Sequence, residues 1–219
     1  ASTIAVPMVM TRGASEIGLY IASSGKQSAM LGFLPLDEGD APDSYGIATH
    51  AINQVNGVTG AAVNQPYLGD TRPDMDENLE RTDWKGDDKD GTGDEGIDQI
   101  LPTDLKGNTN GMIALDRTRP GNYTLTVQAN TGGAPEAYAY AWVDFNQNGK
   151  FDENERSEKA TITKDGNVTL QFNNGPILSD LQLDKLGVRV RVSTYAPDIE
   201  SPTGMSMSGE VEDFETQVI

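Results

Sequence analysis

The sequence predicts an all-β fold, a β-sandwich with long acidic loops. Short runs of apolar and β-branched residues recur at the spacing of sandwich strands from residue 97 onward. Residues 188–192 read Val-Arg-Val-Arg-Val, so the valines should face a core and the arginines should face water or the acidic surface. A sustained helical period is missing, apart from a turn or two around residues 179–185.

The strand candidates cover most of the second half of the chain. In order, they are residues 97–101, 112–115, 121–129, 138–145, 160–163, 168–172 and 187–194. Residues 1–35 contain three further apolar runs, and Pro7 would make the first an edge strand. With 36% hydrophobic content, residues 1–219 are expected to form one domain around one good core.

The charge balance excludes two classes of partner. Lys and Arg total 16 against 34 for Asp and Glu, a formal net charge of −18. Such a field repels nucleic acid and anionic membrane surfaces and attracts divalent cations. No apolar run approaches the roughly 20 residues of a membrane span, so direct membrane insertion is not expected either.

The chain contains no cysteine. Beside the acidic loops, this suggests an extracellular module that is stabilised by metal instead of by disulfides. The first residues have no signal-peptide pattern, so we expect a segment of a longer protein whose export signal or anchor lies elsewhere.

The stretch 144–155 has the spacing of an EF-hand calcium loop. Positions 1, 3, 5, 7, 9 and 12 are Asp144, Asn146, Asn148, Lys150, Asp152 and Glu155, with Lys150 contributing its carbonyl. Gly149 stands at position 6, where the loop turns sharply. A strand-like run, not a helix, precedes the loop, so an ion would fasten a strand end. The alternative is an Asn/Gly-rich turn with solvated carboxylates.

Two more acidic turns are candidates for binding Ca²⁺, the one cofactor expected. A Gly-rich turn contains Asp87, Asp88, Asp90 and Asp94. These carboxylates repel one another unless a cation or water separates them, and the alternative is a mobile acidic loop. Asp40 and Asp43 flank a proline turn, where they either ligate calcium or stop a strand.

The candidates for ligand contact are Trp84, Ser206, Ser208, Glu210 and Arg189. Trp84 adjoins the acidic turn and either faces a ligand or packs. The two serines belong to a hydroxyl-rich loop, residues 203–208, which either faces a ligand or only solvent. Glu210 and Glu212 share one face of a strand, so they could flank a cation or an arginine.

Catalysis is not expected. The chain lacks a Gly-x-Ser-x-Gly elbow, a His-Glu-x-x-His motif and a cysteine nucleophile. With 34 acidic residues, a carboxylate pair suited to glycoside hydrolysis arises by chance. His50 is the single histidine and a poor transition-metal site, so we expect a hydrogen-bonded loop residue there.

The motif Gly-Glu-Val-Glu-Asp-Phe at residues 209–214 and several ordered stretches agree with one bacterial family. These stretches are residues 39–46 with His50, residues 68–69 with Asp74 and Asp76, the acidic turn 87–95, residues 142–149 and residues 188–193. Over roughly residues 37–219 the chain resembles the GEVED domain of bacterial surface adhesins. Residues 1–36 lie outside the resemblance.

The resemblance implies a calcium-rich β-sandwich, an extracellular location at the bacterial cell surface, and adhesion. The chain is also similar to peptide-binding domains of RTX adhesins, which implies that a bound calcium ion helps to hold the free C-terminus of a partner protein. Flanking domains of the same adhesin are then expected beside it.

Three functional hypotheses follow. The first is a calcium-dependent module that recognises a peptide or protein C-terminus on a target cell surface. The second is a glycan-binding version of the same sandwich, with an exposed aromatic beside an open calcium; the candidates are Trp84, Tyr45, Tyr67 and Tyr195. The third is a structural spacer that calcium only stiffens.

Overall fold

The computed structural model describes residues 34–52, 59–73, 84, 113–116, 118–173, 175–176 and 185–216. They belong to one compact unit, Leu34–Ile219. Its helical elements, within these ranges, are the short 3-10 turns Asp43–Tyr45 (η1), Glu153–Glu155 (η3) and Ala196–Ile199 (η5). The predicted all-β class is confirmed. None of the described helices is long and apolar enough to span a membrane.

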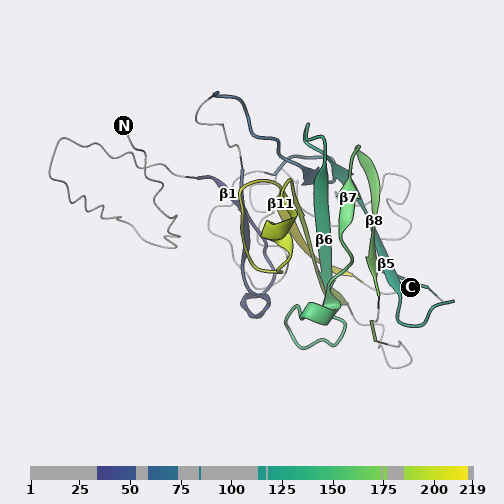
Figure 1. Cartoon of the computed structure of the whole chain (residues 1–219). Coiled ribbons are helices and arrows are strands. Elements are labelled where there is room, and N and C mark those ends of the chain that lie inside the picture. The colour runs from purple at the N-terminus through teal and green to yellow at the C-terminus, as the bar shows by residue number, and fades with distance from the viewer. Residues whose placement is uncertain are drawn as a thin grey trace. The chain divides into compact units, whose positions relative to one another are not determined.

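The first sheet is built around β6 (Ala137–Val143), which Figure 1 shows as the long central arrow. Its other strands are β7 (Ala160–Ile162), β9 (Leu186–Ser193) and β11 (Glu210–Thr216). The order is β11-β9-β6-β7, and every neighbouring pair is antiparallel. Three of these strands match predicted strands to within a few residues.

The second sheet is built around β5 (Tyr123–Asn130). Along one side, β8 (Gly166–Phe172) pairs with it over nearly its whole length. The short strands β3 (Tyr67–Leu68) and β4 (Ala114–Leu115) pair with its two ends. The predicted strand at 97–101 and nearly all of the apolar runs of residues 1–35 lie outside the described residues.

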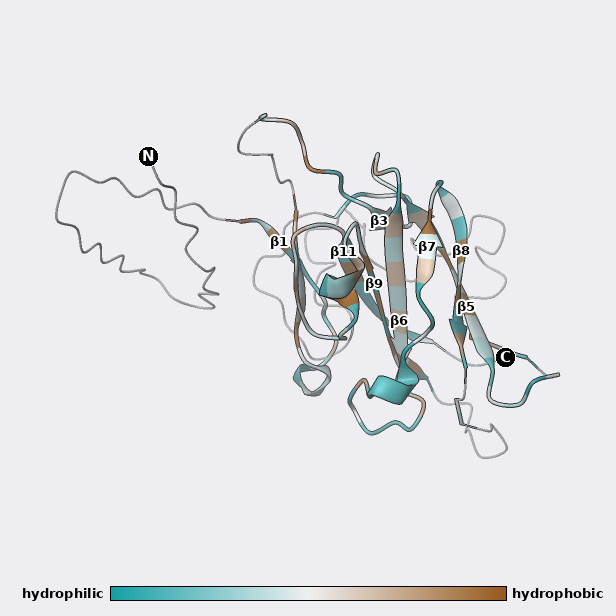
Figure 2. Cartoon of the chain, in the orientation of Figure 1, coloured by the Kyte–Doolittle hydropathy of each residue, from teal (hydrophilic) through white to brown (hydrophobic). Residues whose placement is uncertain are grey.

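The main core lies between these two sheets because each strand points alternate residues inward. From the second sheet come Tyr123, Leu125, Val127, Leu170 and Phe172, and from the first come Ala139, Ala141, Val188, Val190 and Val192. The small alanines of β6 face the bulkier residues of the opposite sheet. Figure 2 shows the resulting bands of high and low hydropathy along β6.

A third sheet consists of β1 (Leu36–Glu38), β2 (Ala48–Ala51) and β10 (Gly204–Ser206). The order is β1-β2-β10, and β10 runs parallel to β2. The segment 203–208 was predicted to be a loop, but its middle residues pair with β2. A segment rich in Gly, Ser and Met has no sequence pattern that predicts a strand. It forms one here because it pairs with β2, which is distant in sequence.

The antiparallel order gives the first sheet two distinct ends. The chain runs along β6 from the turn 131–136 to the loop 144–155, and β9 returns it to the side where β6 began. The turn 131–136, residues 193–197 and the link 207–209 therefore gather at the end opposite the loop 144–155. We call the end of the sheet that carries the loop 144–155 the acidic-loop end.

Candidate metal and ligand site

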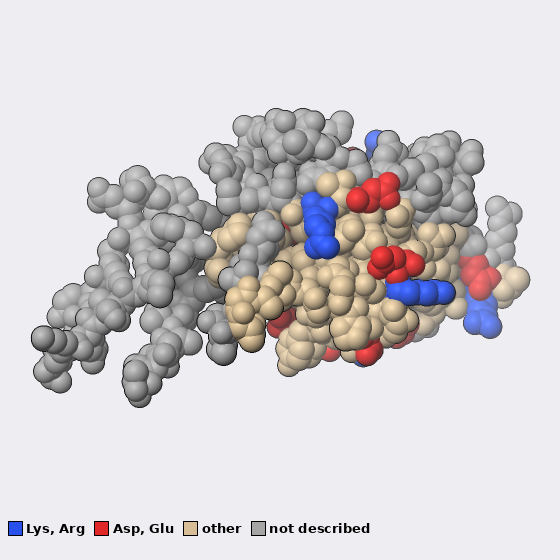
Figure 3. Space-filling view, turned by 90° about the horizontal axis from the view of Figure 1, so that it is seen from above, with Lys and Arg blue, Asp and Glu red and all other residues tan. Residues whose placement is uncertain are grey.

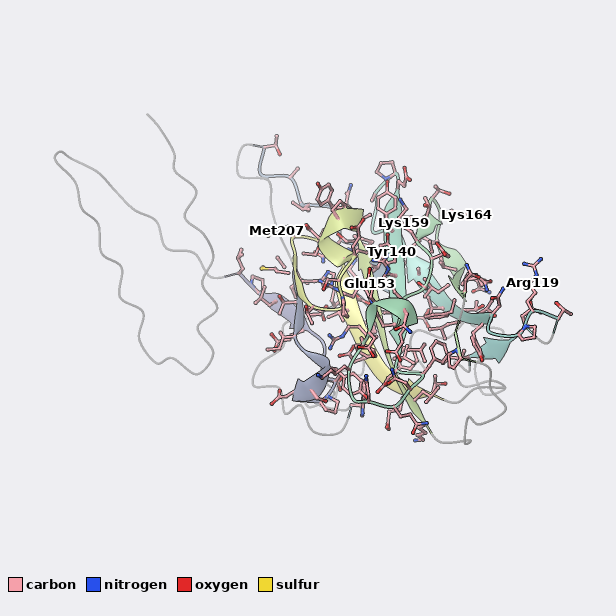
Figure 4. The ribbon with its side chains drawn as sticks, turned by 60° about the horizontal axis from the view of Figure 1, so that its bottom comes forward. Arg119, Tyr140, Glu153, Lys159, Lys164 and Met207 are labelled. Carbon is pink, nitrogen blue, oxygen red and sulfur yellow. The ribbon has the colours of Figure 1, made fainter. Side chains whose placement is uncertain are left out.

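The loop 144–155 begins where β6 ends and closes with η3. Figure 4 brings the bottom of Figure 1 forward and labels Glu153 on η3. The first and last predicted ligands, Asp144 and Glu155, are 1% and 2% exposed, whereas Asn146, Asn148 and Lys150 are exposed. A strand leads into the loop, as the sequence predicts.

Three donors hold the carboxylate of Asp144. Its Oδ1 accepts the amide of Asn148 at 3.1 Å, and its Oδ2 accepts the amide of Gly149 at 2.9 Å and the hydroxyl of Tyr45 at 2.7 Å. Gly149 has φ +78°, a left-handed conformation that favours glycine. The loop therefore turns at its sixth position, and its first carboxylate is oriented toward that turn.

Asp152 is the acceptor for two side-chain amides. Nδ2 of Asn146 and Nδ2 of Asn148 donate to its Oδ2 at 3.0 and 2.8 Å. These bonds, the one from Asn146 first, lower the pKa of Asp152. The Oδ1 atoms of the two asparagines accept the backbone amides two residues later, at 2.9 and 3.0 Å. Both side chains are thus bound inside the loop.

Glu155 closes the loop. Its two carboxylate oxygens accept the amides of Asn146 and Asp152 at 3.2 and 2.9 Å. Burial first, with a smaller effect from the charges of Asp144 and Asp152, raises the pKa of Glu155 to about 7, although the two amide donors lower it. Among the described residues, no basic side chain forms an ion pair with these three carboxylates.

The donor set fits calcium in its chemistry, because carboxylate, amide and backbone carbonyl oxygens are the ligands of that ion. In the described part of the chain, no three acidic or histidine side chains form a group that could hold a metal by themselves. An ion here would therefore depend on neutral oxygens as well. To ligate an ion, Asn146 and Asn148 would have to give up the bonds from Nδ2 to Asp152 and turn their Oδ1 atoms toward the ion.

The turn 39–46, predicted as a separate acidic turn, lies against this loop. Ser44 approaches it so closely that a side chain at Gly149 would come within 3.3 Å of Oγ. Tyr45, in the same η1 turn, reaches the first carboxylate of the loop. Asp43 beside them is exposed, and Asp40 is only 1% exposed. Two patterns about a hundred residues apart in sequence therefore adjoin.

Trp84 packs in an aromatic cluster. Its ring meets that of Tyr45 edge-on with centroids 4.9 Å apart, and Tyr45 also lies 4.7 Å from the ring of Phe151. Trp142 and Ile199 belong to the same cluster. Of the two interpretations of Trp84, the structure thus favours packing. Burial and the bond to Asp144 together raise the pKa of Tyr45.

The prediction that the arginines of β9 face water or the acidic surface is wrong, because both are fully buried. Arg189 is fully buried and forms a two-bonded ion pair with Asp213, from Nε to Oδ1 and from Nη2 to Oδ2, each at 2.7 Å. Its Nη1 donates to the carbonyls of Gly46 and Pro202. Residues 46–50 and 201–204 cover this face of the sheet, so Arg189 has a structural role in place of the predicted ligand contact.

Arg191 and His50 form a second buried polar group. Nε of Arg191 donates to Nε2 of His50 at 3.1 Å, and Nδ1 of His50 donates to the carbonyl of Ser208 at 2.7 Å. Burial first, then the charge of Arg191, lowers the pKa of His50 well below its usual value. Burial also lowers the pKa of Arg191 to about 10. His50 is hydrogen-bonded as predicted, but it lies in a strand and not in a loop.

Glu210 and Glu212 do share one face of β11, as predicted, and both are buried. In the first sheet, Glu210 and Glu212 lie on the face of the β9 valines, and Arg189 lies on the other face. Oε1 of Glu210 accepts the amide of Leu68 at 2.7 Å, which ties the two sheets together. The carboxylate that pairs with Arg189 is instead Asp213, the next residue of the strand, because it lies on the arginine face.

Ser206 and Ser208 are buried, with 0% and 4% exposure. Their hydroxyls lie 2.8 and 3.1 Å from the hydroxyl of Ser193, and the one of Ser208 lies 2.7 Å from that of Thr194. The two serines therefore hold their segment against the end of β9. Met207 between them is exposed.

The predicted metal turn with Asp87, Asp88, Asp90 and Asp94 lies outside the described residues. Two residues with clear roles were not predicted as such: Asp213, which pairs with Arg189, and Tyr45, which orients Asp144. The sequence contained a signal for the first, since Asp213 belongs to the C-terminal acidic motif. For Tyr45 the contact spans 99 residues, and no local pattern indicates it.

Residues 138–217 match the family model of the GEVED domain. The matched region contains all of β6 but its first residue, the acidic loop, β9 and β11, and it includes the motif at residues 209–214. The comparison with curated proteins returned no match, and neither did the comparison with solved structures. The match suggests an adhesin-type module.

Proposed function

We propose that the chain, whose residues 138–217 match the family model of the GEVED domain, is a calcium-dependent ligand-binding module of an extracellular bacterial surface adhesin. Its ligand would be a peptide or the C-terminus of a protein on a target cell. One observation carries the proposal: the loop 144–155 concentrates Asp144, Asp152 and buried Glu155 without a basic partner among the described residues.

Charge supports this function. A chain with a net charge of −18 repels a carboxylate, so it needs a cation to bind one. A calcium ion whose protein ligands leave one position open can accept such a group. The residues that would hold the ion are Asp144, Asn146, Asn148, the carbonyl of Lys150, Asp152 and Glu155. Tyr45 and the amide of Gly149 orient the first of them.

The first experiment tests the metal. We expect Asp144→Ala combined with Glu155→Ala to lower the melting temperature more in calcium than in EGTA. Both buffers lose the hydrogen bonds that the two carboxylates accept, and only the ion-bound state also loses its ligands. At calcium a hundredfold above Kd, the lost stabilisation is about 2.7 kcal/mol. Glu153→Ala is the matched control, since Glu153 is exposed in the same loop and stands outside the ligand pattern. Equal losses in both buffers would contradict a metal role.

The second experiment tests the ligand. Arrays of peptide termini and of glycans are probed with the protein in calcium and in EGTA. Calcium-dependent binding to free C-termini, abolished in the double variant, is the expected result. Binding to glycans alone would favour the carbohydrate-binding alternative. Calcium-dependent melting without binding on either array would favour a structural spacer.

A further inference from the structure

Two asparagines occupy ligand positions of the loop 144–155 at which the calcium pattern also accepts aspartate. They are Asn146 and Asn148, at positions 3 and 5. The carboxylates of the pattern are Asp144, Asp152 and Glu155, and among the described residues none of them forms an ion pair with a basic side chain. On the face that Figure 3 shows, seen from above Figure 1, acidic and basic side chains are interspersed. Because the number of charged ligands tunes the affinity of such loops, the two neutral positions affect how tightly an ion is bound.

Both asparagine amides meet at one carboxylate oxygen. Nδ2 of Asn146 and Nδ2 of Asn148 donate to Oδ2 of Asp152 at 3.0 and 2.8 Å. The hydrogens of an amide carry partial positive charge, so the two amides and a cation compete for the same carboxylate. Hydrogen bonds to an ionised acceptor are roughly twice as strong as bonds between neutral groups, so this competition has a measurable cost.

The other end of each amide is bonded as well. Oδ1 of Asn146 accepts the backbone amide of Asn148 at 2.9 Å, and Oδ1 of Asn148 accepts that of Lys150 at 3.0 Å. Nδ2 of each side chain therefore faces Asp152, and Oδ1 faces the backbone. The two side chains thus order this part of the loop through contacts within the chain alone.

An aspartate at either position would act in the opposite way. A carboxylate has no hydrogen to donate, so the substitution would replace a donor 2.8 or 3.0 Å from Oδ2 of Asp152 with a second negative charge. Two carboxylates this close repel each other unless a cation lies between them. Aspartate would therefore weaken the loop in the absence of an ion and strengthen its binding of one, whereas asparagine does the reverse.

We propose that Asn146 and Asn148 set the calcium concentration at which the loop fills, because their amides compete with the ion for Asp152. This inference rests on the proposed calcium site and adds its threshold. Calcium modules outside cells have Kd values of about 10⁻⁴–10⁻³ M, and cytosolic sensors have values of about 10⁻⁷–10⁻⁵ M. Three carboxylates and two competing amides correspond to the first range. The loop then keeps its order through its own hydrogen bonds at low calcium, and it binds the ion only at extracellular concentrations.

Calorimetric titration with calcium chloride measures this threshold. The variants are Asn146→Asp and Asn148→Asp, and the matched control is Asn154→Asp, which adds the same charge at an exposed position of η3 outside the ligand pattern. We expect a Kd of about 10⁻⁴–10⁻³ M for the unaltered chain and a Kd at least about tenfold lower for each of the first two variants. The control should stay within about threefold of the unaltered chain, because salt screens an exposed charge.

Thermal melting separates this role from a purely structural one. In EGTA, Asn146→Asp and Asn148→Asp should each lower the melting temperature, because the added carboxylate repels Asp152. In calcium at about ten times the Kd of the unaltered chain, the tighter binding of these variants should stabilise them more, so their deficit should shrink or reverse. A side chain that only supports the loop would lower the melting temperature equally in both buffers. Asn154→Asp should melt like the unaltered chain in both.

Failure of this inference differs from failure of the proposed function. No binding by any of these proteins, at calcium up to about tenfold above 10⁻³ M, would overturn the calcium site and this inference with it. A Kd of the unaltered chain below about 10⁻⁴ M, or no tighter binding by the first two variants than by Asn154→Asp, would overturn this inference alone. Circular dichroism reports folding in both buffers. A variant that folds only in calcium would support the inference, and misfolding of both variants in calcium would overturn it.

Discussion

The two ends of the β11-β9-β6-β7 sheet differ in how their polar groups are paired. At the acidic-loop end, Asp144, Asp152 and Glu155 accept hydrogen bonds from amides and from Tyr45, and among the described residues none of the three forms an ion pair with a basic side chain. At the opposite end, the hydroxyls of Ser193, Thr194, Ser206 and Ser208 bond to one another, and that of Ser206 also donates to the carboxylate of Asp198. We propose that the first end binds an ion from outside, whereas the described hydroxyls of the second are paired within the chain.

Between the two ends lies a buried row of charge that belongs to neither. Arg189 pairs with Asp213, and Arg191 donates to His50 and to three carbonyls of residues 201–204. These bonds fasten the third sheet and the segment 201–204 to β9. The contrast between the ends therefore predicts which changes will depend on calcium, which on pH and which on neither.

The largest effect is expected from Asp213→Ala. It leaves Arg189 buried without its carboxylate, which should cost about 3–5 kcal/mol of unfolding free energy. Urea denaturation should show the same loss in calcium and in EGTA, because the pair belongs to neither end. Glu215→Ala, at an exposed position of the same strand, is the control. A loss seen only in calcium would mean that the row belongs to the metal site.

Acid should weaken the fold through His50. Its pKa is lower in the folded state than in the unfolded chain, so the unfolded chain binds the extra proton first. Stability should fall as pH drops below the unfolded value of about 6.5, by at most about 1.4 kcal/mol per pH unit. His50→Gln keeps an acceptor for Arg191 and cannot be protonated, so its denaturation midpoint should depend less on pH over this range. An unchanged pH slope would contradict this role.

Tyr45→Phe tests the acidic-loop end alone. It removes the hydroxyl that donates to Asp144 and leaves the ring packed, so calcium affinity should fall about tenfold, as it does when partners of metal ligands are lost. Isothermal titration calorimetry measures the change. Tyr138→Phe is the control, because that hydroxyl bonds to Glu136 at the other end. Equal affinities of Tyr45→Phe and the unaltered chain would show that Tyr45 only packs.

The smallest effect is expected at the end opposite the acidic loop. Tyr195→Glu changes an exposed ring, so the unfolding free energy should stay within about 0.5 kcal/mol and calcium affinity should not change. Thermal melting and calorimetry check both. A large loss of stability would show that the ring supports the fold.

Much of the fold was predictable because it depends on near neighbours in the chain. The period-two pattern of residues 188–192 placed the valines in the core correctly, and β5 and β8 appeared where the pattern put strands. The same period-two pattern did not predict that the arginines of β9 are buried. A period of two shows which residues share a face, but whether water or protein covers that face is decided elsewhere in the chain.

The sequence by itself determined the acidic loop. Its oxygens recur at the loop's spacing, and Gly149 turns where its position requires, because all these contacts lie within twelve residues. Only the tertiary structure decided what surrounds it: Tyr45 reaches Asp144 across 99 residues, and Arg191 reaches His50 across 141. A buried polar group is stable only with a partner, and that partner is known only once distant segments have packed together.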